Sequence, residues 1–180
     1  MAISTNFNGL FNQRFFNNFL PRPASNNLVL GERTPNFMLP NVQNNTEVKL
    51  SDYWEQKPVL LYFTRIFTEN QYCPLCYPHI KELNENYESF LEAGIEVFMI
   101  TSTDIQQSKL VVRDLGLKMP LLSDSSCQVF RDYNLGQALG APLPGQFLLN
   151  KQGKLCYKHL FSCLSSNAGV EKLLQAVSFL

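Results

Sequence analysis

Two largely apolar runs near the middle of the chain, the first of them continuous, limit its fold more than any other feature. They are PVLLYFT (58–64) and IEVFMITS (95–102), and each has the length of one strand. Neither approaches the roughly 18 apolar residues that a membrane-spanning helix needs. A strand that is apolar at every position is typical of a sheet covered on both faces. The runs therefore predict a buried central sheet between two outer layers.

Helical patterns connect and follow these strands. Apolar residues recur at helical spacing over 74–93, and Gly94 is placed to end that helix. Asp104 is expected to cap a helix over 105–115 that Gly116 ends. The other predicted elements are two short strands within 36–54, a strand in MPLLSD (119–124), a short helix over 125–134, a hairpin turning at 151–153 and a helix over 167–179. This order predicts an α/β fold with a mixed central sheet and helices on both faces.

The first 27 residues differ in composition from the rest. They are rich in Asn and Phe, and no acidic residue occurs before Glu32. Phe and Leu residues between Phe7 and Phe19 follow helical spacing, which predicts a short helix that packs on the domain or on a second subunit. We therefore divide the chain into an N-terminal arm, 1–27, and a domain, 28–180. A homodimer through the arm is one expectation.

The arm also bears on location in the cell. The protein is expected in the cytoplasm, but an acid-free segment with Arg14 and Arg22 is also typical of an organelle transit peptide. Fifteen basic and fifteen acidic residues cancel, so we expect neither nucleic acid nor a membrane surface as a partner.

The cysteines indicate reactivity and not cross-linking. There are five, an odd number, and Cys127, Cys156 and Cys163 lie far along the chain from the pair in QYCPLCYP (71–78). A small secreted protein held by disulfides is denser in cysteine and usually has an even number. We therefore expect a reducing compartment, a reactive pair, and three cysteines with ordinary structural or surface roles.

The pair Cys73 and Cys76 is predicted to lie where a buried strand gives way to a helix. Pro74 suits the first helical position, which makes Cys73 the expected N-cap and puts Cys76 one turn inside. Unpaired N–H groups at a helix N-terminus favour a thiolate, which is the reactive form of cysteine. We assign Cys73 as the attacking thiol and Cys76 as the resolving thiol. His79 is expected at the surface.

Residues 28–178 resemble the thioredoxin-fold redoxins, in particular the peroxiredoxin-like AhpC/TSA family. The matching pieces are GERTPNFMLPNV, VKLSDYWEQKPVLLYF, CPLC, GIEVFMITS, MPLLSD and PGQFLLNKQGKL. The resemblance implies a thioredoxin-like mixed sheet and thiol redox chemistry. It also implies that Pro144 follows a cis peptide bond beside the cysteines. Pro144 would then line a substrate groove together with Tyr72, Pro74 and Leu143.

The chain departs from both families that it resembles. Peroxiredoxins carry Pro-x-x-x-Thr-x-x-Cys, but Ile66 and Asn70 stand at the Pro and Thr positions, and Pro144 replaces their late arginine. Arg65 and Arg131 are candidate replacements for that arginine. Thioredoxins have a Trp before the first cysteine, where this chain has Tyr72, and a buried acid on the preceding strand, where it has none. Glu69 is a candidate proton acceptor, although a solvated loop carboxylate is the commoner role.

These observations predict a thiol–disulfide oxidoreductase that uses Cys73 and Cys76 and needs no cofactor beyond its redox-active disulfide. Its expected partners are a protein or small-molecule disulfide and an upstream thiol reductant. One alternative is a peroxiredoxin-type peroxidase, and another is a redox-regulated interaction protein. A structural zinc module is the third, and its ligands would come from Cys73, Cys76, His79, Cys156, His159 and Cys163. No metal is expected in the favoured reading.

Overall fold

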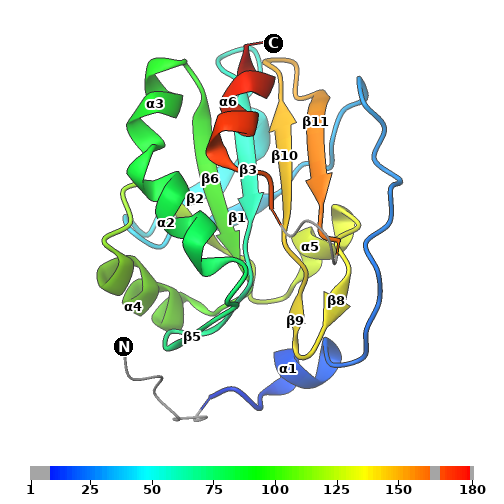
Figure 1. Ribbon diagram of the computed structural model, residues 1–180, viewed down its shortest axis with the longest axis vertical. Coiled ribbons are helices and arrows are strands. Elements are labelled where there is room, and N and C mark those ends of the chain that lie inside the picture. Colours follow the sequence, from blue (N-terminus) through cyan, green and yellow to red (C-terminus); the bar gives the residue numbers. More distant parts are fainter. Residues whose placement is uncertain (1–8, 163–166, 179–180) are drawn as a thin grey trace.

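A five-stranded mixed sheet forms the centre of the protein (Figure 1). The computed structural model describes residues 9–162 and 167–178. The strand order is β11-β10-β3-β6-β7, with β3, β6 and β7 parallel and β10 antiparallel to both of its neighbours. The strands are β3 (Val59–Phe63), β6 (Glu96–Thr101), β7 (Leu121–Ser123), β10 (Gly145–Leu149) and β11 (Leu155–Leu160). The two apolar runs are β3 and β6, so both predicted strands and the mixed sheet are confirmed.

The two faces of the sheet carry different layers, as predicted. Alternate residues of β3 point to opposite sides, so Leu60 and Tyr62 join one core cluster while Val59, Leu61 and Phe63 join the other. The first cluster is covered by α2 (Tyr77–Glu85), α3 (Tyr87–Glu92), α4 (Ile105–Leu115) and α6 (Val170–Val177). The second is covered by α5 (Gln128–Asp132), the 3-10 helix η1 (Leu50–Tyr53) and the hairpin of β1 (Met38–Pro40) and β2 (Glu47–Lys49). Within the described ranges, no helix has the length and apolarity to cross a bilayer.

Helix boundaries follow the capping residues. The Asp104 side chain accepts a hydrogen bond from the Gln107 backbone N–H, and Gly116 is left-handed, so α4 begins and ends where predicted. The single helix predicted over 74–93 is wrong, because it is divided at Asn86 into α2 and α3. The Asn86 side chain donates to the Glu82 carbonyl, in competition with the helical backbone. Gly94 has a positive φ of 75° and follows α3 as expected.

The arm forms a shorter helix than its apolar pattern predicts. Helix α1 covers only Gln13–Asn17, and the predicted start at Phe7 lies outside the described residues. The arm continues past the hairpin of β8 (Gln137–Ala138) and β9 (Ala141–Pro142), to which it is joined by backbone hydrogen bonds between Arg22 and Gln137 (Figure 1). Phe15 is buried against Gly140, where a Cβ would come within 2.0 Å of the ring. The arm therefore packs on its own domain, while the boundary at residue 28 and a dimer through the arm stay predictions.

Candidate active site

The cysteine pair lies just beyond the carboxyl end of the central strand. After β3 the chain forms the small hairpin of β4 (Ile66–Thr68) and β5 (Gln71–Tyr72), and Cys73 follows immediately. The Cys73 backbone N–H donates to the Arg65 carbonyl at 3.2 Å, which holds Cys73 close to the end of β3. The predicted position at a strand end, ahead of a helix, is confirmed.

The start of the helix differs in detail from the prediction. Cys76 and not Cys73 is the N-cap of α2, so that part of the prediction is wrong. The Cys73 carbonyl still accepts hydrogen bonds from the N–H groups of Cys76 and Tyr77, which makes residues 73–77 one helix-like turn. Pro78 has no N–H to donate to the Pro74 carbonyl, so the regular helix starts one turn later.

The two sulfurs differ in accessibility. Both cysteines are free thiols, but Cys73 keeps 6% of its surface exposed while Cys76 is fully buried. Pro74 and Leu75, which lie between them, are exposed. A bulky disulfide can therefore reach Cys73 before it can reach Cys76, which supports the roles assigned to them.

The thiols of Cys73 and Cys76 also differ in acidity. The hydrogen bond that Cys73 receives from the Cys76 thiol lowers the pKa of Cys73 to about 5, with help from the Leu75 and Cys76 backbone N–H groups and the Arg65 charge, against the effect of burial. Donating that hydrogen bond, together with burial, raises the pKa of Cys76 well above its ordinary value. At neutral pH the site therefore holds one thiolate and one thiol.

Alkylation of the reduced protein should show this difference directly. Because the pKa of Cys73 is depressed, its thiolate fraction and its rate with iodoacetamide should rise through a midpoint near pH 5 and level off well below pH 7. Cys76 should stay unmodified over the same range. Peptide mapping after timed alkylation measures both rates. A Cys73 midpoint near that of a free thiol, about pH 8.5, would contradict this picture of the site.

Arg65 is the arginine that the fold brings to the cysteines. Its guanidinium lies 4.6 Å from the Phe67 ring centroid, interacts with the Cys73 sulfur and donates to the Ala138 carbonyl of β8. Arg131 instead donates to the Ser126 carbonyl and to Gln128. Of the two candidate replacements for the missing arginine, Arg65 lies beside the Cys73 sulfur, whereas Arg131 bonds to residues of its own helix region.

The predicted groove residues have different surroundings. Tyr72 is half-buried, and its ring packs on Tyr77 at 5.4 Å between centroids. Leu143 and Pro144 are buried. Because Gly145 pairs with Phe63, Pro144 lies next to the carboxyl end of β3. The expected cis bond before Pro144 is wrong, because that peptide is trans.

The candidate proton acceptor and the residue at the Thr position pair with each other. Asn70 is exposed, and its side-chain amide donates to the Glu69 carboxylate at 3.2 Å. Neither group is therefore held toward the Cys73 sulfur by a contact of its own. The role of Glu69 stays a prediction that nothing in this geometry strengthens.

Asn167 belongs to the site but was not predicted. It lies just before α6, is 7% exposed, and its side-chain amide is 4.0 Å from the Cys76 sulfur and 3.4 Å from the Leu75 carbonyl. Only the fold brings these groups together, because 91 positions separate Asn167 from Cys76. The sequence placed Asn167 at the start of the helix predicted over 167–179, where an Asn is ordinary and carries no signal of contact with a cysteine.

The zinc alternative has no support in the described ranges. No group of three or more His, Cys, Asp or Glu side chains that could hold a metal is present there. His79 is partly exposed and pairs with Glu82 at 3.4 Å, while Cys156 is exposed on β11. Cys163, one of the ligands considered, lies outside the described residues.

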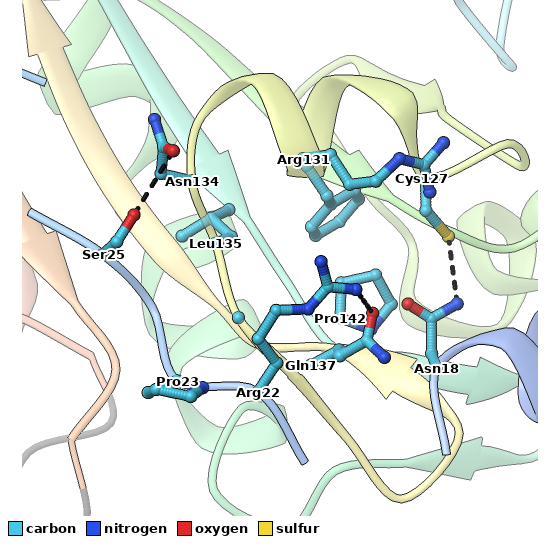
Figure 2. A pocket seen from close by; sticks show the side chains of 12 residues that line it. Asn18, Arg22, Pro23, Ser25, Cys127, Arg131, Asn134, Leu135, Gln137 and Pro142 are labelled. Carbon is cyan, nitrogen blue, oxygen red and sulfur yellow. Dashed lines mark hydrogen bonds between the residues drawn. The ribbon is translucent and has the colours of Figure 1, made fainter. Parts of the chain in front are cut away.

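A separate cavity of about 350 Å³ lies between the arm and the β8–β9 hairpin (Figure 2). The Cys127 sulfur faces it beside Asn18, whose amide nitrogen is 3.7 Å away, and Arg22 and Arg131 also line it. Burial and the Asp124 charge raise the pKa of Cys127 to about 11, so this thiol is protonated and unreactive at neutral pH. Neither cysteine of the CPLC pair lines this cavity.

Comparison with known proteins gives a consistent result. The model of a family described as the AhpC/TSA family matches residues 30–158. A thiol-disulfide oxidoreductase ResA of Geobacillus kaustophilus is 27% identical over 154 residues, which are 83% of this chain and 79% of that protein. The ResA of Bacillus anthracis is 30% identical and is matched over 71% of this chain and 68% of its own length.

Solved structures show the same fold. Peroxidoxin BcpB of Mycobacterium tuberculosis superposes with a TM-score of 0.71 at 18% identity, covering 85% of this chain and 98% of that one. AhpC of Enterococcus faecalis gives a TM-score of 0.72 at 17% identity, covering 84% and 92%. At these identities the likeness establishes the thioredoxin-like fold and nothing finer.

Proposed function

The chain belongs to the AhpC/TSA family and is an oxidoreductase of thioredoxin-like fold, and we propose that Cys73 and Cys76 carry out its thiol–disulfide exchange. The observation that carries the proposal is the pairing of a lowered pKa at the more accessible Cys73 with a raised pKa at the buried Cys76. Cys73 is thereby a thiolate that can attack a disulfide, while Cys76 stays protonated until the mixed disulfide has formed. Such exchange needs no cofactor, because both electrons come from the two sulfurs.

The reaction has two steps. In the first, the Cys73 thiolate attacks one sulfur of the substrate disulfide, the S–S bond breaks, and the departing thiolate takes up a proton. In the second, Cys76 gives up its proton and attacks the Cys73 sulfur of the mixed disulfide. The second substrate thiol leaves, and the Cys73–Cys76 disulfide remains. An upstream thiol reductant then restores the reduced pair.

The surroundings of Cys73 favour a disulfide within a polypeptide or a small apolar molecule. Leu75, between the two cysteines, is 55% exposed, and Tyr72 and Tyr77 offer partly buried rings beside it. Exposed apolar and aromatic side chains beside a reactive group are suited to contact with an extended chain. Pro144 and Leu143, next to the carboxyl end of β3, would complete the groove.

Peroxide reduction is the second candidate, and the position of Arg65 is what favours it. A guanidinium beside Cys73 can stabilise the charge that develops as an O–O bond breaks. The other donor expected in a peroxidase, at Asn70, is instead paired with Glu69. One lost donor of this kind costs about 10²- to 10³-fold in rate. Disulfide reduction is therefore the better supported activity.

One comparison of substrates tests both candidates. Reduced protein should reduce insulin or a small disulfide in repeated turnovers with an added thiol reductant. Its oxidation by hydrogen peroxide in stopped flow should be slow, close to that of a free low-pKa thiol. Fast oxidation of Cys73 by peroxide, with negligible disulfide reduction, would reverse the ranking and indicate that Arg65 suffices for peroxidase chemistry.

A further inference from the structure

Several polar side-chain atoms around the cysteines are buried without a hydrogen-bond partner. Within the described ranges they include the Tyr62 hydroxyl, the Thr64 hydroxyl and the Asn167 side-chain oxygen. The Tyr62 and Thr64 hydroxyls are close enough to affect each other's acidity, but they do not form a hydrogen bond of normal geometry. Burial of a polar group without a partner is unfavourable, because the group loses its hydrogen bonds to water. Such a cluster next to reactive sulfurs indicates groups that find their partners only during the reaction.

Tyr62 is the most confined of these groups. It is 1% exposed and lies on the face of β3 that packs against Ile80 of α2, the helix that Cys76 caps. The Tyr62 ring therefore lies beneath the start of α2, and the pKa of Tyr62 is raised by burial first and then by the charge of a Cys76 thiolate, as expected of two groups in the same layer. With so high a pKa the phenol keeps its proton and can only be a donor toward an anion.

The position of Asn167 beside the Cys76 sulfur is fixed by hydrogen bonds of the next residue, Ala168. The Ala168 backbone N–H donates to the Gln146 side-chain oxygen at 2.7 Å, and the Gln146 amide donates back to the Ala168 carbonyl at 3.2 Å. Gln146 is fully buried on β10. This reciprocal pair fixes the chain next to Asn167, so its amide stays beside the Cys76 sulfur.

We propose that the Tyr62 hydroxyl and the Asn167 amide form a binding site for the Cys76 thiolate, to which both donate hydrogen bonds in the resolving step. The proposal rests on the function proposed above. The Cys76 thiol must ionise in an apolar interior to attack the mixed disulfide. Donors that are already in place stabilise such a charge strongly, because the interior has a low dielectric constant and no reorganisation is needed.

The resolving step balances in atoms and electrons, with solvent as the proton acceptor. Once Cys73 is bound to substrate sulfur, it no longer accepts the hydrogen bond from Cys76. The Cys76 thiol then gives its proton to solvent, the bond between Cys76 and Cys73 forms, and the bond between Cys73 and substrate sulfur breaks. The departing sulfur takes up a proton from solvent, or stays a thiolate where its pKa is low. Tyr62 and Asn167 donate hydrogen bonds throughout and lose no proton.

In a chain that carries Cys156→Ser and Cys163→Ser, Ellman's reagent separates the two steps, because each releases one coloured thiolate. The first release reports attack by Cys73, and the second reports resolution by Cys76. Tyr62→Phe should leave the first release unchanged and slow the second by about 10²-fold, the typical effect of removing one such donor. The pH midpoint of the second release should also move upward. An unchanged second release, or equal slowing of both, would overturn the proposal.

Tyr157→Phe is the matched control. It removes another buried and unpaired tyrosine hydroxyl, on the edge strand β11, and should change neither release. Asn167→Ser is a second, independent variant that should slow only the second release. If Tyr62→Phe does not fold, a normal second release in Asn167→Ser overturns the proposal. A chain with only the two serine substitutions that releases only one thiolate would instead contradict the proposed function itself.

Discussion

Cys73→Ser is expected to lower disulfide reduction by at least about 10³-fold, because it removes the only thiolate at the site that a substrate can reach. Cys76→Ser is also expected to stop turnover, but with a different outcome. Its Cys73 thiolate can still attack, and the mixed disulfide that forms has no resolving thiol. This variant should therefore accumulate a covalent complex with its substrate.

Mass spectrometry of the two variants after exposure to a disulfide peptide distinguishes these outcomes. In the proteolytic fragment that carries residues 73–76, Cys76→Ser should gain the mass of one substrate thiol, and Cys73→Ser should gain none. Cys156→Ser, which replaces an exposed cysteine away from the pair, is the control and should turn over normally. Equal trapping by the Cys73 and Cys76 variants would show that the attacking and resolving roles have been assigned wrongly.

Phe15→Ala is expected to lower the free energy of unfolding by about 3 kcal/mol. The Phe15 ring is 9% exposed, lies in edge or tilted contact with Phe11, Phe16 and Phe19, and fills the space beside Gly140. Deleting it leaves a cavity between the arm and the β8–β9 hairpin. Because the Ala138 carbonyl of that hairpin accepts from Arg65, the Cys73 environment should loosen as well.

Phe16→Ala provides the comparison from the same helix. Its side chain is 63% exposed, so the change in unfolding free energy should stay within about 0.5 kcal/mol. Urea unfolding of both variants measures the difference. If Phe15→Ala were as mild as Phe16→Ala, the arm would not be docked on the domain in solution.

Local chemistry in the sequence was enough to predict most of the architecture. The apolar runs of β3 and β6, the Asp104 cap and the Gly116 stop of α4 each depend on neighbours within a few positions, so their patterns could be read directly. The cysteine spacing likewise predicted the pair that the structure places beyond the end of β3. The same local patterns missed the division at Asn86, whose side chain competes with the helical backbone. They also missed the start of α2 at Tyr77, ahead of Pro78, which lacks an N–H for the preceding turn.

Only the tertiary structure decided which distant groups meet the cysteines. It brings Arg65 and not Arg131 to Cys73, and it places Asn167 beside Cys76 across 91 positions of sequence. The pKa difference between the two thiols depends on the same packing, because burial and one shared hydrogen bond set both values. The sequence by itself determined that the chain carries a dithiol at the end of a buried strand. The hydrogen bond within the CPLC turn is the largest influence on which thiol is ionised, and long-range packing adds the burial of both cysteines and the Arg65 charge. These contributions needed the tertiary structure, because charge in a low-dielectric interior depends on every group within a few ångströms, wherever that group lies in the chain.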